Sequence, residues 1–305
     1  MMVELFVPGR LCLPGEHTDW AAGYPSLDGA SFNVGEAIVT GIDQGLHARV
    51  SLLSPHDHDD VRFIFRSSSS PDLSLDVPIG SAADQVALLS IAVSGSPASY
   101  VAGCVHHLLS SGTARISNTA GVLIDNHTTT MPMQKGLSSS AAVCVLVVRA
   151  FNVLLDLGLS AEQEMELAYH GERTTPSQCG RLDQAGCAFG SRPVRLTFDA
   201  QAQLAAVVPI PLRCDLFFVI VDLGAHKDTR TILSDLNACF QSPAPTAVQL
   251  AVRAYLGHVS PSITVKAIEA MERGDPVALG ALLTSAQAHF DTVRATTINI
   301  ILIFN

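Results

Sequence analysis

The loop at residues 132–142, Pro-Met-Gln-Lys-Gly-Leu-Ser-Ser-Ser-Ala-Ala, most constrains the fold, because it joins a strand-like segment to a long apolar helix. A loop that opens a helix offers unpaired backbone N–H groups and the positive end of the helix dipole to an anion. Small residues let phosphate oxygens come close, and a hydroxyl there is a possible Mg²⁺ ligand. The alternative is a serine-rich N-cap, since Ser is favoured there for the same N–H groups.

The apolar stretch 141–155 that follows this loop predicts a core helix. Arg149 and Asn152 interrupt it, and it is too short to span a bilayer. Residues 1–10 lack the basic segment, apolar core and cleavage site of a secretory signal. We therefore expect no membrane partner.

Periodicity along the rest of the chain predicts an α+β fold, because strands and helices alternate irregularly. With 48% hydrophobic and 15% charged residues, the 305-residue chain can bury one large core or two smaller ones. The expected strands are 3–7, 37–42, 46–53, 121–124, 204–210 and 216–221, with Gly and Asp turns between the first three. The expected helices are 99–109, 139–157, 161–173, 232–238, 246–255, 263–272 and 276–290. The pattern restarts after Phe198, so we place a domain boundary near residue 200.

Charge and cysteine usage exclude several classes of protein. A formal net charge of -10 without clustered Lys and Arg argues against a nucleic-acid partner. The seven cysteines are scattered and contain no C-x-x-C pair, which indicates neither a disulfide framework nor a zinc site. They are typical of reduced, mostly buried thiols in a cytoplasmic protein.

A polar cluster follows the first expected strand, in the run Pro-Gly-Arg-Leu-Cys-Leu-Pro-Gly-Glu-His-Thr-Asp-Trp at residues 8–20. Arg10, Glu16, His17 and Asp19 place a guanidinium, two carboxylates and an imidazole beside a core strand, which is costly unless they have a function. Such groups suit hydrogen bonds to several hydroxyls of a polyol, with Arg10 stabilising a transferred phosphoryl group. The alternative is a salt-bridged surface turn.

A third segment, 171–184, places Glu172 at the end of an expected helix and Asp183 in a glycine-containing loop. One carboxylate can hold a metal on triphosphate oxygens while the other orients or deprotonates an attacking hydroxyl. The alternative is a pair of solvated carboxylates.

In this order, the three segments resemble the motifs of the galactokinase, homoserine kinase, mevalonate kinase and phosphomevalonate kinase (GHMP) superfamily. The runs Gly-Glu-His-Thr-Asp and Cys-Gly-x-x-Asp-Gln are similar to those of galactokinases, whose pattern carries Tyr where this chain has Trp20. The resemblance covers residues 8–23, 125–145 and 171–190. It implies an N-terminal ribosomal-protein-like α+β domain over 1–200 and a ferredoxin-like α+β domain over 201–305.

Carried over to this chain, the resemblance implies a sugar 1-kinase that uses ATP and Mg²⁺. It makes Arg10 and Asp183 the catalytic pair, and Glu16, His17, Asp19 and Gly180 the sugar contacts. Ser140 and, by analogy with mevalonate kinases, Glu172 would be the Mg²⁺ ligands. The implied ATP-binding residues are Lys135, Gly136, Leu137, Ser138, Ser139, Ser140 and Ala141. Mevalonate kinases carry Lys in place of Arg10 and lack the carboxylate of Asp19, so the substrate side points to a sugar.

The likeness is incomplete in two places. Galactokinases usually have two glycines where this loop has Gln134 and Lys135, so its backbone takes a less permissive path, and Lys135 either faces the phosphates or faces solvent. The glycine-rich third motif expected after residues 281–291 is missing, and the chain ends in the apolar run 298–305. We interpret this as a C-terminal domain that stops before completion; a native tail would be a late strand or an aggregation-prone edge.

Two further polar runs are also explained by a turn or by a helix terminus. Residues 56–60, His-Asp-His-Asp-Asp, have metal-ligand types but lie in an expected hairpin turn, which favours a solvated turn. Residues 221–230 occupy the place of a sugar-side loop in galactokinases, although a helix N-terminus begun by Asp228 or Thr229 explains their polarity equally well.

Three other functions remain open from the sequence. They are a mevalonate-type kinase of a non-sugar alcohol, a sugar- and ATP-sensing protein on the same fold, and an inactive truncated product.

Overall fold

The computed structural model describes residues 2–21, 24, 34–54, 60–116, 121–133, 135–177, 179–199, 203–219 and 229–295. The chain is α+β, as expected, and forms two compact units that are each discontinuous in sequence. The first unit comprises Met1–Arg10 and Gly41–Gly190, and the second comprises Leu11–Thr40 and Ser191–Asn305. The expected family domains 1–200 and 201–305 stay a prediction. Within the described ranges, no helix has the length and apolar composition needed to cross a membrane.

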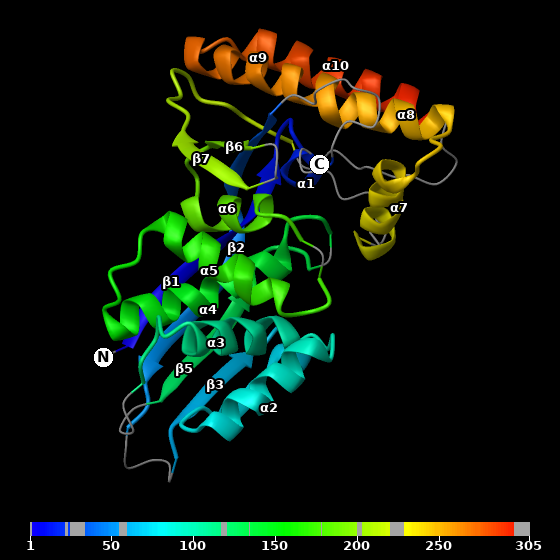
Figure 1. The fold of residues 1–305 in the computed structure, drawn as a ribbon. Helices are drawn as coiled ribbons and strands as arrows, with labels where there is room; N and C mark the ends of the chain where they lie inside the picture. Colours follow the sequence, from blue (N-terminus) through cyan, green and yellow to red (C-terminus); the bar gives the residue numbers. More distant parts are fainter. Residues whose placement is uncertain are drawn as a thin grey trace. The chain divides into compact units, whose positions relative to one another are not determined.

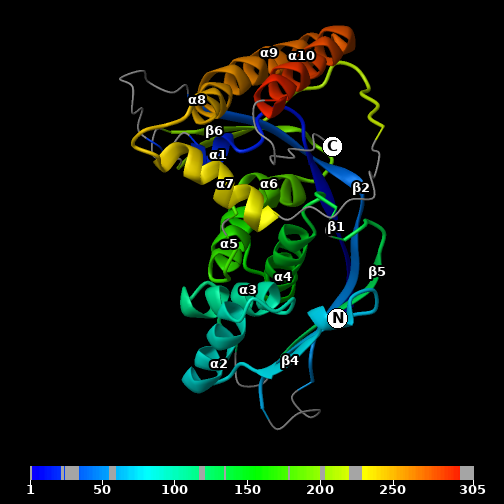
Figure 2. The same ribbon diagram turned by 90° about the vertical axis from the view of Figure 1, so that its right-hand side faces the viewer.

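A helical layer on one side of a strand layer makes up the first unit, as Figure 2 shows. Two strands, β1 (Met2–Cys12) and β2 (Gly35–Leu52), continue from one unit into the other. The other strands of the first unit are β3 (Arg62–Ser67), β4 (Leu75–Pro78) and β5 (Val122–Thr129). Its helices are η1 (Pro71–Leu73), α2 (Ala82–Val93), α3 (Ser99–Ser110), α4 (Ser139–Leu155), α5 (Ala161–Arg173) and α6 (Leu182–Phe189).

The strands of this unit pair in the order β4-β3-β5-β2, and β1 pairs with β2. The β3–β5 pairing is parallel, whereas β3–β4 and β2–β5 are antiparallel. The expectation of two short strands separated by Gly and Asp turns at 37–53 was wrong, because β2 runs through without a turn. Its glycines allow close backbone approach instead. A Cβ on Gly41 would lie 2.6 Å from the Gly190 carbonyl oxygen, and one on Gly45 would lie 2.2 Å from that of Val7.

Helix α4 is the core helix expected from the apolar stretch after the serine loop, and the prediction is confirmed. Nearly all of its residues from Ala141 to Phe151 are buried, including Phe151, which stacks on Phe63 of β3 with ring centroids 5.9 Å apart. A helix that is apolar around its whole circumference needs neighbours on all sides. Helices α3, α5 and α6 and strand β5 supply them (Figure 1).

The second unit contains a short antiparallel sheet and a set of helices. Strands pair in the order β2-β6-β7, with Gly35 opposite Phe198. Besides part of β2, its elements are α1 (Thr18–Ala21), β6 (Val194–Phe198), β7 (Leu204–Pro209), α7 (Thr229–Gln241), α8 (Ala247–Ala254), the π-helix η2 (Tyr255–Val259), α9 (Ser260–Arg273) and α10 (Pro276–Ala295). Of the strand expected at 216–221, the described residues 216–219 form none.

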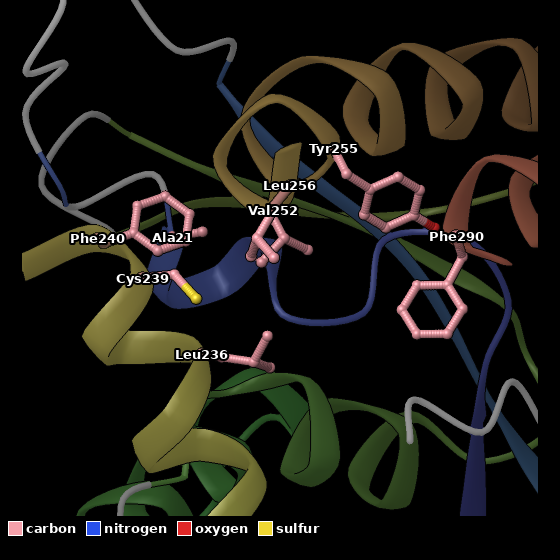
Figure 3. Packing of buried hydrophobic residues seen from close by; sticks show 8 residues of the cluster. All are labelled: Ala21, Leu236, Cys239, Phe240, Val252, Tyr255, Leu256 and Phe290. Carbon is pink, nitrogen blue, oxygen red and sulfur yellow. The ribbon is translucent and has the colours of Figure 1, made fainter. Parts of the chain in front are cut away.

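Two small cores hold this unit together. One lies between α1, α7, α8, η2 and α10 and is shown in Figure 3; its buried members are Ala21, Leu236, Cys239, Phe240, Val252, Tyr255, Leu256 and Phe290. The other joins β2 to the α9–α10 hairpin. The two helices expected at 246–255 and 263–272 form one helical run through η2. Pro261 lacks the N–H that an unbroken α-helix needs there, and a π-helical turn precedes it.

Two glycines allow α3 and α5 to cross closely. A Cβ on Gly103 would lie 2.4 Å from the carbonyl oxygen of Gly171, and a Cβ on Gly171 would lie 2.7 Å from the Cα of Cys104. Such contacts are shorter than carbon and oxygen atoms tolerate, so neither position accepts a side chain without moving a helix. Gly171 directly precedes Glu172, so this crossing lies beside that carboxylate in the last turn of α5.

We predict opposite effects on stability for two helical glycines. Gly103→Ala should lower the free energy of unfolding by about 1–3 kcal/mol, because its methyl group overpacks the α3–α5 crossing. Gly280→Ala in α10, where a Cβ has nothing within 4 Å, should raise it by roughly 0.5–1 kcal/mol through helix propensity. Urea unfolding followed by circular dichroism measures both, and a Gly103→Ala variant as stable as the parent would contradict the close crossing.

Candidate functional site

Arg10 brings together one residue from each of the three sequence motifs. Its Nε donates a hydrogen bond to Asp183 Oδ1 at 2.7 Å, and a terminal nitrogen donates to the same oxygen. The other terminal nitrogen donates to the Gly136 carbonyl oxygen at 3.0 Å. Arg10 is 7% exposed and its partner Asp183 lies 173 positions along the chain, so Arg10 is not part of a surface turn.

The sequence predicted that Asp183 lies in a glycine-containing loop. That prediction was wrong, because Asp183 lies in the first turn of α6. The positive end of a helix dipole favours a carboxylate at such a position. Its side chain is 30% exposed, whereas that of Arg10 is 8% exposed. The carboxylate is therefore fixed by a buried cation on one side while part of it stays open to solvent or to a ligand.

The backbone of the serine loop rules out an ordinary N-cap at α4. The N-cap residue Ser138 is left-handed, with φ 61° and ψ 49°, and its side chain makes no capping hydrogen bond. Its buried Oγ has no hydrogen-bond partner among the described residues. By contrast, Ser81, Ser160 and Thr246 form full capping boxes on α2, α5 and α8. The hydroxyl of Ser138 is thus held in a geometry that capping does not explain.

Two backbone contacts attach this loop to β1. The Arg10 N–H donates to the Leu137 carbonyl oxygen at 3.1 Å, and a Cβ on Gly9 would lie 2.9 Å from that oxygen. Gly136 has φ 83°, a left-handed conformation that glycine adopts freely. Within the loop, Leu137 and Ala141 point into the core, and the half-buried residues are Lys135, Gly136, Ser138, Ser139 and Ser140. Gln134 lies outside the described residues.

Glu172 ends α5 as expected and lies in a network of side chains that includes the serine loop. It is 2% exposed and accepts hydrogen bonds from Gln184 Nε2 at 2.8 Å and from Ser177 Oγ at 3.3 Å. The Ser140 hydroxyl also hydrogen-bonds to it. Ser140 and Glu172, expected together as metal ligands, are therefore neighbours, and a solvated Glu172 is excluded.

Burial is the main cause that raises the pKa of Glu172 to about 7, and the nearby carboxylate of Asp183 raises it further. Hydrogen bonds from Ser140, Gln184 and Ser177 act in the opposite direction because they stabilise the charged form. A cation beside Glu172 would offset both the burial and the repulsion from Asp183.

The oxygen atoms of Ser140 and Glu172 are of the kind that Mg²⁺ prefers. In the described part of the chain, no group of three or more His, Cys, Asp or Glu side chains is placed to hold a metal ion. Mg²⁺ commonly uses one or two protein oxygens and completes its shell with phosphate oxygens and water. The residues present fit that arrangement.

Three of the expected sugar contacts belong to the second unit and one belongs to the first. In the second unit, His17 and Asp19 are 7% and 6% exposed and Glu16 is half-buried, which does not fit a solvated surface turn. In the first unit, Gly180 is half-buried between α5 and α6. Residues 55–59, 221–228 and 296–305, which include most of the His-Asp run, the sugar-side loop and the apolar tail, lie outside the described residues. Helix α7 does begin at Thr229.

Sequence reasoning missed Gln184, the hydrogen-bond donor between α6 and Glu172. Gln184 is 0% exposed, and its Oε1 has no partner among the described residues. The signal was present, because Gln184 directly follows Asp183 in the Cys-Gly-x-x-Asp-Gln run. The geometry of α6 turns the side chain of Gln184 inward to Glu172, and the sequence alone does not show this.

The raised pKa of Glu172 predicts a stability effect with a definite sign. Between about pH 4.5 and 7 the folded chain keeps a proton on Glu172 that the unfolded chain releases, so this group's contribution to the free energy of unfolding falls as pH rises through that window. Glu172→Gln, which stays neutral, should therefore gain stability relative to the parent between pH 5 and pH 8, by on the order of 3 kcal/mol.

Urea unfolding of both proteins at a series of pH values measures this difference. Glu162→Gln, an exposed glutamate on the same helix, is the matched control and should change far less because water already solvates its carboxylate. A difference between Glu172→Gln and the parent that does not vary with pH would show that Glu172 has an ordinary pKa.

Comparison with known proteins bears on the fold that carries these residues. Residues 99–191 match the family model of the GHMP kinases N terminal domain. The Lactococcus lactis galactokinase solved with galactose superposes with a TM-score of 0.68 at 19% identity, covering 95% of this chain and 75% of that chain. The L. major mevalonate kinase solved with R-mevalonate gives 0.62 at 18% identity, covering 95% and 76%.

A third structure carries a nucleotide analogue. The Streptococcus pneumoniae phosphomevalonate kinase in complex with phosphomevalonate and AMPPNP gives a TM-score of 0.58 at 14% identity, covering 95% of this chain and 80% of that chain. Residues 99–191, a range that contains the serine loop, Glu172 and Asp183, therefore match the GHMP kinase N-terminal domain, and the chain has the fold of these kinases.

Proposed function

We propose that this chain is a kinase that transfers the γ-phosphoryl group of ATP to the anomeric hydroxyl of a monosaccharide. The observation that carries the proposal is that Arg10 donates hydrogen bonds both to Asp183, from Nε at 2.7 Å, and to Gly136 at 3.0 Å. This arrangement joins a carboxylate, a guanidinium and a helix-opening serine loop, which are the groups that phosphoryl transfer requires.

Asp183 is proposed to orient the attacking hydroxyl and accept its proton. Both hydrogen bonds from Arg10 to Asp183 end on Oδ1. We therefore assign Oδ2 as the oxygen that accepts the proton of the attacking hydroxyl. Arg10 would stabilise the charge that develops on the transferred group. Positioning and electrostatic stabilisation supply most of the rate in phosphoryl transfer generally.

The serine loop is proposed to bind the ATP phosphates through residues Lys135 to Ala141. Support comes from the left-handed Ser138, whose hydroxyl does not cap the helix, and from the glycine at 136 with its positive φ. Ser140 and Glu172 would hold Mg²⁺, which neutralises phosphate charge when it is bound. Its positive charge would also keep Glu172 ionised against the burial that raises its pKa.

On the substrate side we propose sugar-hydroxyl contacts from Glu16, His17, Asp19 and Gly180. Carboxylates and an imidazole in a largely buried environment can each take one or two hydroxyl hydrogen bonds. Arg10 and Asp19 favour a sugar over a mevalonate-type alcohol because of the resemblance to galactokinases.

A coupled ATPase assay with MgATP tests the proposal on the whole chain. The panel contains D-galactose, other hexoses, pentoses, uronic acids and R-mevalonate. We expect ADP formation that depends on an aldose, with a product that carries phosphate on its anomeric carbon by ³¹P NMR. Turnover of R-mevalonate alone would identify a non-sugar kinase. Binding of sugar and nucleotide by calorimetry without turnover would identify a sensor.

Replacing the proposed base gives a second prediction. Asp183→Asn should lower the sugar-dependent rate by about 10²–10⁴-fold, because the amide cannot accept the proton. The matched control is Asp72→Asn, an exposed aspartate of η1, which should leave the rate unchanged. Equal rates for Asp183→Asn and the parent would remove Asp183 from the mechanism, and equal rates at background level would mean that the chain is inactive.

A further inference from the structure

The loop that carries His17 is held to β2 within the second unit. The Ile38 N–H donates to the Pro14 carbonyl oxygen at 3.0 Å, and Thr18 Oγ1 lies 2.9 Å from the Glu36 carbonyl oxygen. A Cβ on Gly15, whose φ is 108°, would lie 2.4 Å from that same carbonyl oxygen. The loop therefore has little freedom to move away from the strand.

His17 adopts a conformation that is uncommon for a non-glycine residue. Its φ is 66°, in the left-handed region, and its side chain is largely buried. A residue is kept in this region only where its surroundings impose it. The Ala21 N–H, which donates to the His17 carbonyl oxygen at 3.3 Å, and the contacts of Thr18 impose it here. The backbone from which the imidazole projects is thus held in place by the loop.

Trp20 determines which nitrogen of that imidazole carries the proton. The indole Nε1 donates a hydrogen bond to His17 Nδ1 at 3.3 Å. An indole N–H can only donate, so Nδ1 must be the accepting, unprotonated nitrogen. A neutral imidazole then holds its proton on Nε2, because the hydrogen bond made by one ring nitrogen sets the state of the other.

Aromatic neighbours in the second unit fix the indole in turn. The Trp20 ring meets Phe240 edge-on, with centroids 5.5 Å apart at 81°, and meets Tyr24 at 6.1 Å and 90°. Tyr24 stacks on Phe240 and donates its hydroxyl to Asn237 Oδ1 at 2.6 Å. Figure 3 shows Phe240 of this cluster beside Ala21 of α1. Edge-to-face contacts of this kind favour one ring orientation.

We propose that Trp20 is a positioning residue that locks His17 as an Nε2–H hydrogen-bond donor. The group recognised by His17 is then an oxygen lone pair of the ligand, from a hydroxyl or a carboxylate, and not a hydroxyl proton. This inference rests on the proposed function for the statement that the ligand is a sugar, but not for the tautomer itself. The Tyr that the galactokinase pattern carries at this position has a hydroxyl that both donates and accepts, and would impose no such choice.

The first experiment needs no ligand and no activity. Long-range ¹⁵N–¹H NMR of histidine-labelled protein distinguishes a pyrrole-type nitrogen from a pyridine-type one, and the His17 signals are those missing from His17→Gln. We expect pyrrole-type Nε2 and pyridine-type Nδ1 in the parent chain. A parent chain with its proton on Nδ1 would overturn the inference, and His17→Gln serves only to assign the signals.

Two variants separate the N–H group from aromatic packing. Trp20→Phe removes the indole donor and keeps an aromatic ring, so His17 should shift to a mixture of tautomers. Tyr24→Phe removes the hydroxyl that donates to Asn237 and accepts from Gln241, and should leave the tautomer of His17 unchanged. An unchanged tautomer in Trp20→Phe, or equal shifts in both variants, would overturn the inference, because a structural effect of the cluster would then explain the data.

The second experiment tests what the tautomer does for binding, with D-galactose as the probe. Trp20 is the only tryptophan of the chain, so its fluorescence reports directly on the ring next to His17. We expect a saturable change in the emission of the parent, and roughly tenfold weaker galactose binding by calorimetry in Trp20→Phe than in Tyr24→Phe. Equal affinities in the two variants would show that the lock has no role in recognition.

The two experiments fail in distinguishable ways. If the parent has the expected tautomer but D-galactose does not bind, the sugar assignment in the proposed function is wrong and the positioning role of Trp20 stands. If galactose binds and is phosphorylated but His17 carries its proton on Nδ1, the proposed function stands and this inference is wrong.

Discussion

The Arg10–Asp183 ion pair is the interaction on which the rest of the first unit is arranged. It joins the end of β1 to the start of α6, and a third nitrogen of the same guanidinium reaches the serine loop at Gly136. Arginine suits this position because its planar fork offers several donors at fixed angles, whereas lysine offers one compact charge. Removing either member would leave the other charge in a largely buried place, at a cost greater than the pair itself contributes.

Around that pair, the first unit holds two carboxylates in different environments. Asp183 has a cation beside it and is partly open, while Glu172 is enclosed and has only neutral donors, so its pKa rises to about 7. Their repulsion is a further reason for the raised pKa. A carboxylate whose pKa is raised by burial beside a second carboxylate is common where one of the two serves as a base and the other as a ligand.

Much of this arrangement could be predicted from the sequence, and the misses have physical causes. Helix α5 begins and ends at the expected residues, and the apolar run at 141–155 forms the expected core helix. The glycines at 41 and 45 suggested turns, because a glycine in a sequence can indicate either a positive φ or a close approach of two backbones. Here both glycines allow a close approach. The role of Gln184 and the left-handed backbone of Ser138 depend on contacts between distant segments, which no local pattern encodes.

The interleaving of the two units has a consequence during synthesis on the ribosome. The segment Gly35–Val39 of β2 pairs with 194–198 of β6, but all of Gly41–Gly190 must be made in between. At a typical elongation rate this takes about ten to thirty seconds, during which one edge of the nascent strand has no β6 to pair with. Chaperones that shield strand edges would thus act on this chain during that interval, before β6 has been made.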